Sequence, residues 1–199
     1  MKFVSLSLAT SFLALGANAA PTTTLFCDVS SMSVPSSGLS TQNGPTKYLL
    51  YGAGVQKYTC GDDGKYASNG ADAELYDISC TYDPNVGFVV LKPEYIVGRH
   101  YFITNPITGS GLSPKWDLIS AFQNDDAYVV GAKKENVPAV SPRPDVDVDW
   151  LYLNNVEGDL ANEIFRTNTS GGQPPASCTP GESASVWYHA FYWFTGGSI

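Results

Sequence analysis

Histidine is scarce in this chain, and the common catalytic motifs are missing from it. His100 and His189 are the only histidines among 199 residues, which leaves few groups that titrate near neutral pH. The sequence contains no H-E-x-x-H, no C-x-x-C pair and no G-x-S-x-G, so the usual zinc and serine-hydrolase patterns are absent. It also contains neither G-x-G-x-x-G nor a Walker-type G-K-[ST]. The sequence therefore excludes an NAD-dependent dehydrogenase and indicates no cofactor and no resident metal.

Basic residues are also few. Lys and Arg number 11 against 19 Asp and Glu, a net charge of −8, and the only basic doublet is Lys133-Lys134. Phosphate binding needs a basic patch, so a nucleic-acid partner is excluded, as is a polybasic membrane anchor. The scattered acidic residues indicate a solvated surface.

The sequence contains one long apolar run, at its start. Residues 3–15 are almost wholly apolar, Lys2 precedes them, and Ala17-Asn18-Ala19 follows as a small-x-small pattern. This arrangement predicts a signal peptide over residues 1–19 that is cleaved between Ala19 and Ala20. The run is too short to span a bilayer and no second one follows, so no transmembrane segment is expected. The sequence thus predicts a secreted protein, extracellular or bound to a cell wall.

Four cysteines occur, Cys27, Cys60, Cys80 and Cys178. In an exported chain an even set is normally structural, so we expect two disulfides and no catalytic cysteine. The spacing alone leaves all three pairings open.

The remaining chain has the pattern of an all-β protein. A Ser-, Thr-, Gly- and Pro-rich lead-in covers residues 20–45, and a single β domain is expected over residues 46–199. Turn residues separate short segments rich in Val, Ile, Tyr, Phe, Trp and Thr, at 47–51, 55–59, 73–78, 86–91, 100–104, 128–132, 150–153, 164–167 and 185–194. Gly52-Ala53-Gly54 suggests a bulge or bend inside one long strand. Helical spacing occurs only at residues 159–164. The spacing predicts a single-domain antiparallel β-sandwich or β-barrel.

The closing segment, residues 186–194, is the most aromatic part of the chain. As a strand it places Trp187, His189, Phe191 and Trp193 on one face and Tyr188, Ala190, Tyr192 and Phe194 on the other. One interpretation is a central strand covered on both sides. The alternative is an aromatic platform on which a sugar ring or a lipid stacks.

Three further features have a structural and a functional interpretation. His100 and His189 lie in aromatic strand contexts typical of core histidines. Asp145, Asp147 and Asp149 would share one face of an extended chain, where Ca²⁺ could relieve their repulsion, but a solvated connector explains them better. Asn168-Thr169-Ser170 is a glycosylation sequon in a predicted loop.

Several segments together resemble one known family of secreted fungal and bacterial proteins that is catalogued as a domain of unknown function. They are GVQKYTC at 54–60, LYD at 75–77, GRHYF at 98–102, WLYL at 150–153, RTNTSGGQPPASC at 166–178 and YWF at 192–194. The resemblance runs from about Lys47 to the C-terminus. Fungal members often carry a malate dehydrogenase label, which the residues here do not support. The resemblance implies pairing of Cys60 with Cys178 and of Cys27 with Cys80. The chain departs from bacterial members between Phe102 and Lys133.

Three functions follow as hypotheses. The first is a non-catalytic binding module, cell-surface, wall-associated or host-facing, with a carbohydrate or a cell-surface or host protein as partner. The second is an extracellular enzyme, a hydrolase or lyase, with His100, Arg166 and Asp77 as candidate catalytic residues. The third is a carrier that holds a small apolar ligand inside a barrel.

Overall fold

The computed structural model describes residues 25–35, 38–83 and 91–199. The predicted signal peptide and its Ala19–Ala20 cleavage site lie outside these ranges, as does nearly all of the strand expected at 86–91. Within the described ranges, no helix is both long and apolar enough to cross a membrane.

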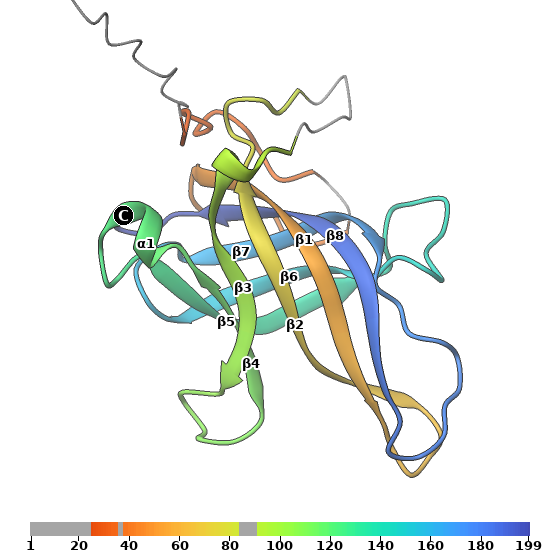
Figure 1. Cartoon of the computed structure of the whole chain (residues 1–199). Coiled ribbons are helices and arrows are strands. Elements are labelled where there is room, and N and C mark those ends of the chain that lie inside the picture. The colour runs from red at the N-terminus through yellow and green to blue at the C-terminus, as the bar shows by residue number, and fades with distance from the viewer. Residues whose placement is uncertain (1–24, 36–37, 84–90) are drawn as a thin grey trace, which may run out of the picture.

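The described residues form a closed antiparallel β-barrel (Figure 1). Each strand pairs with its neighbours in chain order, and β8 pairs with β1 to close the barrel. The strands are β1 (Thr46–Cys60), β2 (Tyr66–Asp77), β3 (Ile96–Thr104), β4 (Leu112–Asp117), β5 (Tyr128–Val137), β6 (Trp150–Glu157), β7 (Glu163–Gly171) and β8 (Ser183–Thr195). Two short helices occur in connections, the 3₁₀ turn η1 (Pro93–Tyr95) and α1 (Ile119–Phe122). The all-β prediction is confirmed, and of its two architectures the structure is the barrel.

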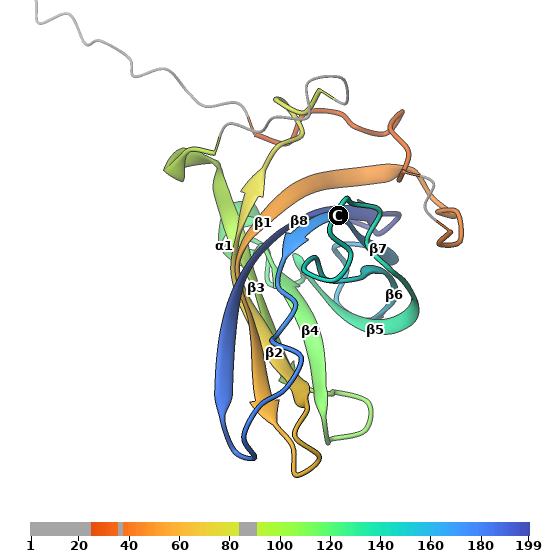
Figure 2. The same ribbon diagram turned by 90° about the vertical axis from the view of Figure 1, so that its right-hand side faces the viewer.

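Strands β1 and β8 are long and curved (Figure 2). The segments expected at 47–51 and 55–59 are indeed one strand, and its even-numbered residues face the barrel interior. Gly54 permits close packing against β2, because a Cβ at this position would lie 2.1 Å from the Asp72 carbonyl oxygen. The register shift against β2 lies between Gln56 and Tyr58, after the glycines rather than at them.

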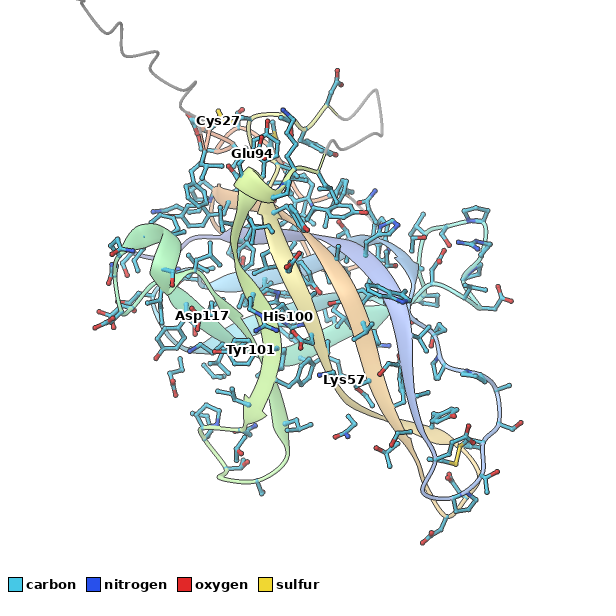
Figure 3. The ribbon with its side chains drawn as sticks, in the orientation of Figure 1. Cys27, Lys57, Glu94, His100, Tyr101 and Asp117 are labelled. Atoms are coloured by element: carbon cyan, nitrogen blue, oxygen red, sulfur yellow. A yellow bond between two sulfur atoms is a disulfide. The ribbon has the colours of Figure 1, made fainter. Side chains whose placement is uncertain are left out.

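The lead-in closes one end of the barrel. The Phe26 ring packs against Phe122 of α1, with centroids 4.7 Å apart, and against Tyr48 of β1 at 5.6 Å. The Cys27–Cys80 disulfide holds this segment in place, at the top of the molecule in Figure 3. We call this the closed end. The opposite end carries the β1–β2, β3–β4, β5–β6 and β7–β8 connections, and we call it the open end.

A second apolar cluster lies outside the barrel wall. Lead-in residues Val29, Met32 and Val34 cover the outward side chains of β8, Phe191 and Trp193. The inward side chains Tyr188, Ala190, Tyr192 and Phe194 are all buried in the barrel. The expectation of a strand covered on both faces therefore holds for the C-terminal half of β8, whereas Trp187 is 77% exposed.

One helix prediction is wrong. Residues 158–162 form the connection between β6 and β7, and residues 163–164 already belong to β7. The Asn155 side chain donates hydrogen bonds to the carbonyl oxygens of Gly158 and Ala161 and so organises a turn in place of a helix. The apolar pair that suggested helical spacing, Leu160 and Ala161, packs into the barrel core at the closed end.

Candidate functional site

A cavity of about 710 Å³ occupies the open end of the barrel. Its lining is mixed, and the apolar part comes mainly from β3, β4 and β6, including Phe102, Leu112, Pro114, Leu151 and Leu153. Polar groups enter from β1, β5 and β7, including Gln56, Tyr58, Lys133 and Arg166. The Cys60–Cys178 disulfide joins the end of β1 to the β7–β8 connection beside this opening. This is the pairing implied by the family resemblance, as is Cys27–Cys80.

Arg166 lies on the inner face of β7, between Leu151 of β6 and Tyr192 of β8. Its Nε and Nη2 donate hydrogen bonds to the Asp149 carbonyl oxygen at 3.1 and 2.7 Å. No carboxylate of the described residues forms an ion pair with the guanidinium. The positive charge is therefore held inside the barrel by a neutral carbonyl oxygen, and other N–H groups of the guanidinium can donate hydrogen bonds to a ligand.

A pair of buried tyrosines lies next to this arginine. The Tyr188 and Tyr192 hydroxyl oxygens are 3.0 Å apart. Burial raises the pKa of Tyr188 well above its ordinary value and also raises that of Tyr192, against the opposing effect of the Arg166 charge. Both hydroxyls therefore stay protonated and can donate hydrogen bonds.

Gln56 is the least satisfied polar residue of the cavity. Its side chain is 5% exposed and lies next to the Tyr188 hydroxyl. Its amide nitrogen is buried and makes no hydrogen bond of good geometry within the described residues, although the Tyr188 hydroxyl is its neighbour. A buried donor without an acceptor costs free energy, so this nitrogen marks a position where a ligand acceptor would be stabilising.

His100 belongs to the wall beneath the cavity. It is 2% exposed, its ring stacks on Trp116 with centroids 4.5 Å apart, and its Nδ1 lies 2.9 Å from the Lys115 carbonyl oxygen. Burial lowers its pKa to about 4, and the Arg166 charge adds to this shift. The imidazole is therefore neutral and packed as an aromatic core residue; Figure 3 shows it in the middle of the barrel.

The structure separates Asp77 from the other two candidate catalytic residues. His100 and Arg166 both lie inside the barrel beside Tyr192. Asp77 lies at the closed end, where its carboxylate accepts hydrogen bonds from the backbone N–H of Phe26 at 2.6 Å and of Ser79 at 3.0 Å. Its position is that of an anchor for the lead-in, and the cavity lining does not include it.

Comparison with known families shows what kind of protein this is. The model of a family described as protein of unknown function (DUF3455) matches residues 40–196. The chain belongs to the DUF3455 family. This confirms the family identified from the sequence. No curated protein and no solved structure matches the chain.

The DUF3455 match includes the barrel but not the part of the lead-in that covers its closed end. All eight strands lie within it, and so do the cavity residues Gln56 and Arg166. Phe26 and Cys27 precede it. The closure by the lead-in is therefore built from residues outside the matched part of the chain.

The DUF3455 barrel also has an aromatic surface on its outside. Trp187 lines a shallow groove of about 350 Å³ with Tyr51, His189 and Val146. The His189 ring stacks on Tyr51 with centroids 5.2 Å apart. Its Nδ1 is buried without a partner in the described chain, and burial lowers its pKa despite the nearby charge of Asp147.

The three alternating aspartates do not share a face. Asp145 is exposed, Asp149 lines the cavity, and Asp147 is buried. The Asp147 carboxylate accepts hydrogen bonds from the Ser141 hydroxyl and the Gly171 backbone N–H, each at 2.6 Å. It anchors the β5–β6 connection to β7, and within residues 25–35, 38–83 and 91–199 no cluster of three metal ligands occurs.

The sequon lies in a strand and not in a loop. Asn168 belongs to β7 at the register shift between Thr167 and Ser170, and its φ of 49° turns the chain outward there. The Asn168 side chain is exposed, so the acceptor amide faces solvent on the barrel wall.

Proposed function

We propose that this DUF3455 protein is an exported, non-catalytic binding protein that holds a small organic molecule in the open end of its barrel. The observation that carries the proposal is the cavity of about 710 Å³, lined by apolar and polar side chains in similar proportion. Small-molecule sites are typically clefts of about 300–1,000 Å³, in which apolar groups hold the ligand and polar groups orient it. The two disulfides support export, because such bridges persist in oxidising compartments.

The polar groups of the cavity support binding over catalysis. Of the described residues, Asp149 is the one carboxylate in the lining, and it accepts a hydrogen bond from Asn136 at 2.9 Å. His100 is packed against Trp116 with a pKa of about 4 and is outside the lining. General acid–base catalysis needs a group of suitable pKa within hydrogen-bond reach of the substrate. Arg166 and Gln56 are instead suited to binding and orienting a ligand.

Filling the cavity should weaken ligand binding. N-phenyl-1-naphthylamine, a neutral apolar fluorophore, should bind the native protein with increased fluorescence. Leu151→Trp places a larger side chain among the cavity walls and should weaken binding about tenfold or more, equivalent to about 1.4 kcal/mol. Ile107→Trp, at a 70% exposed position of the β3–β4 loop, is the matched control and should bind as the native protein does. Equal binding by Leu151→Trp, with circular dichroism showing a folded barrel, would contradict the proposal.

The outer aromatic surface favours a second candidate function, carbohydrate binding. Trp187 presents an exposed ring next to Tyr51 and His189, and flat aromatic faces stack on sugar rings. Such a site would suit the wall-associated or host-facing role expected from the sequence.

Removing the exposed ring tests this second function. Trp187→Ala should reduce retention on insoluble cell-wall glycans by up to about tenfold, the effect of losing an aromatic contact of about 1.5 kcal/mol. The melting temperature should hardly change, because an exposed side chain contributes little to folding. Ile107→Ala removes an equally exposed apolar side chain elsewhere and serves as the control. If the native protein is not retained on any glycan tested, the carbohydrate function is wrong.

A further inference from the structure

The charge of the cavity lining is opposite in sign to that of the whole protein. The chain carries a net charge of −8, yet the cavity is lined by two cations, Lys133 and Arg166, and one anion, Asp149. The Asp149 carboxylate already accepts a hydrogen bond from Asn136. Arg166 is half-buried and has no ion-pair partner in the described chain. A half-buried positive charge without an ion-pair partner is stabilised by an anion, since the local dielectric is lower than that of bulk water.

Gln56 adds a neutral donor close to the same charge. Its amide lies beside the Tyr188 hydroxyl, which is 3.0 Å from the Tyr192 hydroxyl, and Tyr192 is next to Arg166. Gln56 and Arg166 thus flank one pair of tyrosines on the inner wall. Unpartnered and 5% exposed, the Gln56 amide nitrogen requires an acceptor. Both residues line the cavity, so an amide donor and a guanidinium donor face the same space, where each can bind an oxygen of a carboxylate.

We infer that the cavity takes an apolar molecule with a carboxylate head, and that Arg166 and Gln56 bind this head. The inference rests on the proposed function, since it names the ligand class of the same cavity. The body of the ligand packs against Phe102, Pro114 and Leu153. Burial of such a body supplies most of the affinity, at roughly 25 cal/mol per Å² of apolar surface, while the charged head sets the specificity.

Three probes with one body and different heads test the inference. They are 2-naphthoate, 2-naphthamide and 2-naphthylmethylammonium, titrated by calorimetry against the native protein. The anion should bind about tenfold or more tightly than the neutral amide, as expected for hydrogen bonds to a charged group. The cation should bind more weakly than both. If the amide or the cation binds as tightly as the anion, the inference is overturned.

Two variants test which residues bind the carboxylate head of the ligand. Arg166→Met should reduce the preference for naphthoate over naphthamide to about twofold or less, because it removes the charge. Since Arg166 also supports the Asp149 carbonyl, Gln56→Met provides a second variant that leaves the Arg166 charge and its contact with Asp149 in place. It should weaken naphthoate binding by about threefold to tenfold and leave naphthamide binding unchanged. Lys134→Met is the control, because Lys134 lies outside the barrel over the Tyr152 ring.

The outcomes separate the inference from the function on which it rests. A preference for naphthoate that persists in both Arg166→Met and Gln56→Met would overturn the inference. A second outcome would also overturn the inference: all three probes fail to bind, while N-phenyl-1-naphthylamine binds the native protein and binds Leu151→Trp more weakly. In that case the proposed function would stand. If the neutral fluorophore also fails to bind, both are wrong.

Discussion

Replacing both Cys60 and Cys178 with serine should lower the free energy of unfolding by about 4–5 kcal/mol. The two residues are 118 positions apart, and a bridge across so long a loop restricts the unfolded chain strongly. Small domains have a total stability of only about 5–15 kcal/mol. The variant should therefore be close to unfolding at 37 °C. Urea denaturation followed by tryptophan fluorescence measures the loss.

The other disulfide provides the comparison. Cys27 and Cys80 are 53 positions apart, for which the same loop model gives about 4 kcal/mol. Here part of the loss should be local, because the lead-in can detach while the barrel stays paired. Hydrogen exchange at the Phe26 amide, which donates to Asp77, should accelerate in Cys27→Ser/Cys80→Ser before the barrel amides do. The first prediction would be contradicted if Cys60→Ser/Cys178→Ser lost less than about 1 kcal/mol of unfolding free energy. The barrel would then stay closed by strand pairing without the help of this bridge.

Acidification should destabilise the protein through His100. Burial lowers the pKa of this histidine from 6.5 to about 4 in the folded state. The folded protein therefore resists protonation that the unfolded chain accepts. The free energy of unfolding has its full value above pH 6.5 and declines as the pH falls from 6.5 to 4, by about 3 kcal/mol in total. Unfolding free energies measured by urea titration at intervals between pH 7 and pH 4.5 test this range.

His100→Gln should remove most of this pH dependence. The variant loses the stacking on Trp116, so it is less stable at pH 7, but its stability should be nearly constant down to pH 4.5. His189→Gln is the control, because His189 is only half-buried and its pKa is lowered less. Asp147 and Glu163, whose pKa values are also lowered in the folded state, lose their contribution at lower pH. If the free energy of unfolding of His100→Gln declines with falling pH as steeply as that of the native protein, other groups cause the acid sensitivity.

Much of the fold could be predicted from local pattern. A strand alternates its side chains with a period of two, so the composition of residues 186–194 was sufficient to define two faces of β8. The same alternation in β1 explains why its even-numbered residues are interior. The helix predicted at 159–164 was wrong because hydrogen bonds from Asn155 to the turn, together with core packing of Leu160, outweighed a weak helical spacing. Strand β4 and helix α1 were not expected, since six and four residues carry little periodic signal.

The candidate site was only partly predictable. Arg166, which the sequence suggested as a candidate catalytic residue, does line the cavity. Gln56 was overlooked, although it shares one face of β1 with Tyr48, Leu50 and Tyr58, and an amide on an otherwise apolar face was a usable signal. Asp77 was grouped with Arg166 although it lies at the closed end. Position along a strand does not show which end of a barrel a residue occupies until its register with the neighbouring strands is known.

Sequence alone was sufficient for the strand content, the acidic surface, the absence of common catalytic motifs and the family, because each depends on residue type or on short-range spacing. The choice of a barrel over a sandwich was decided by the pairing of β1 with β8, whose residues are more than 120 positions apart. That closure, and the position of Gln56 and Arg166 in one cavity beside the buried Tyr188 and Tyr192, depend on contacts between distant strands. Local propensity cannot specify such contacts, since the register of distant strands is selected by the packing of the whole core.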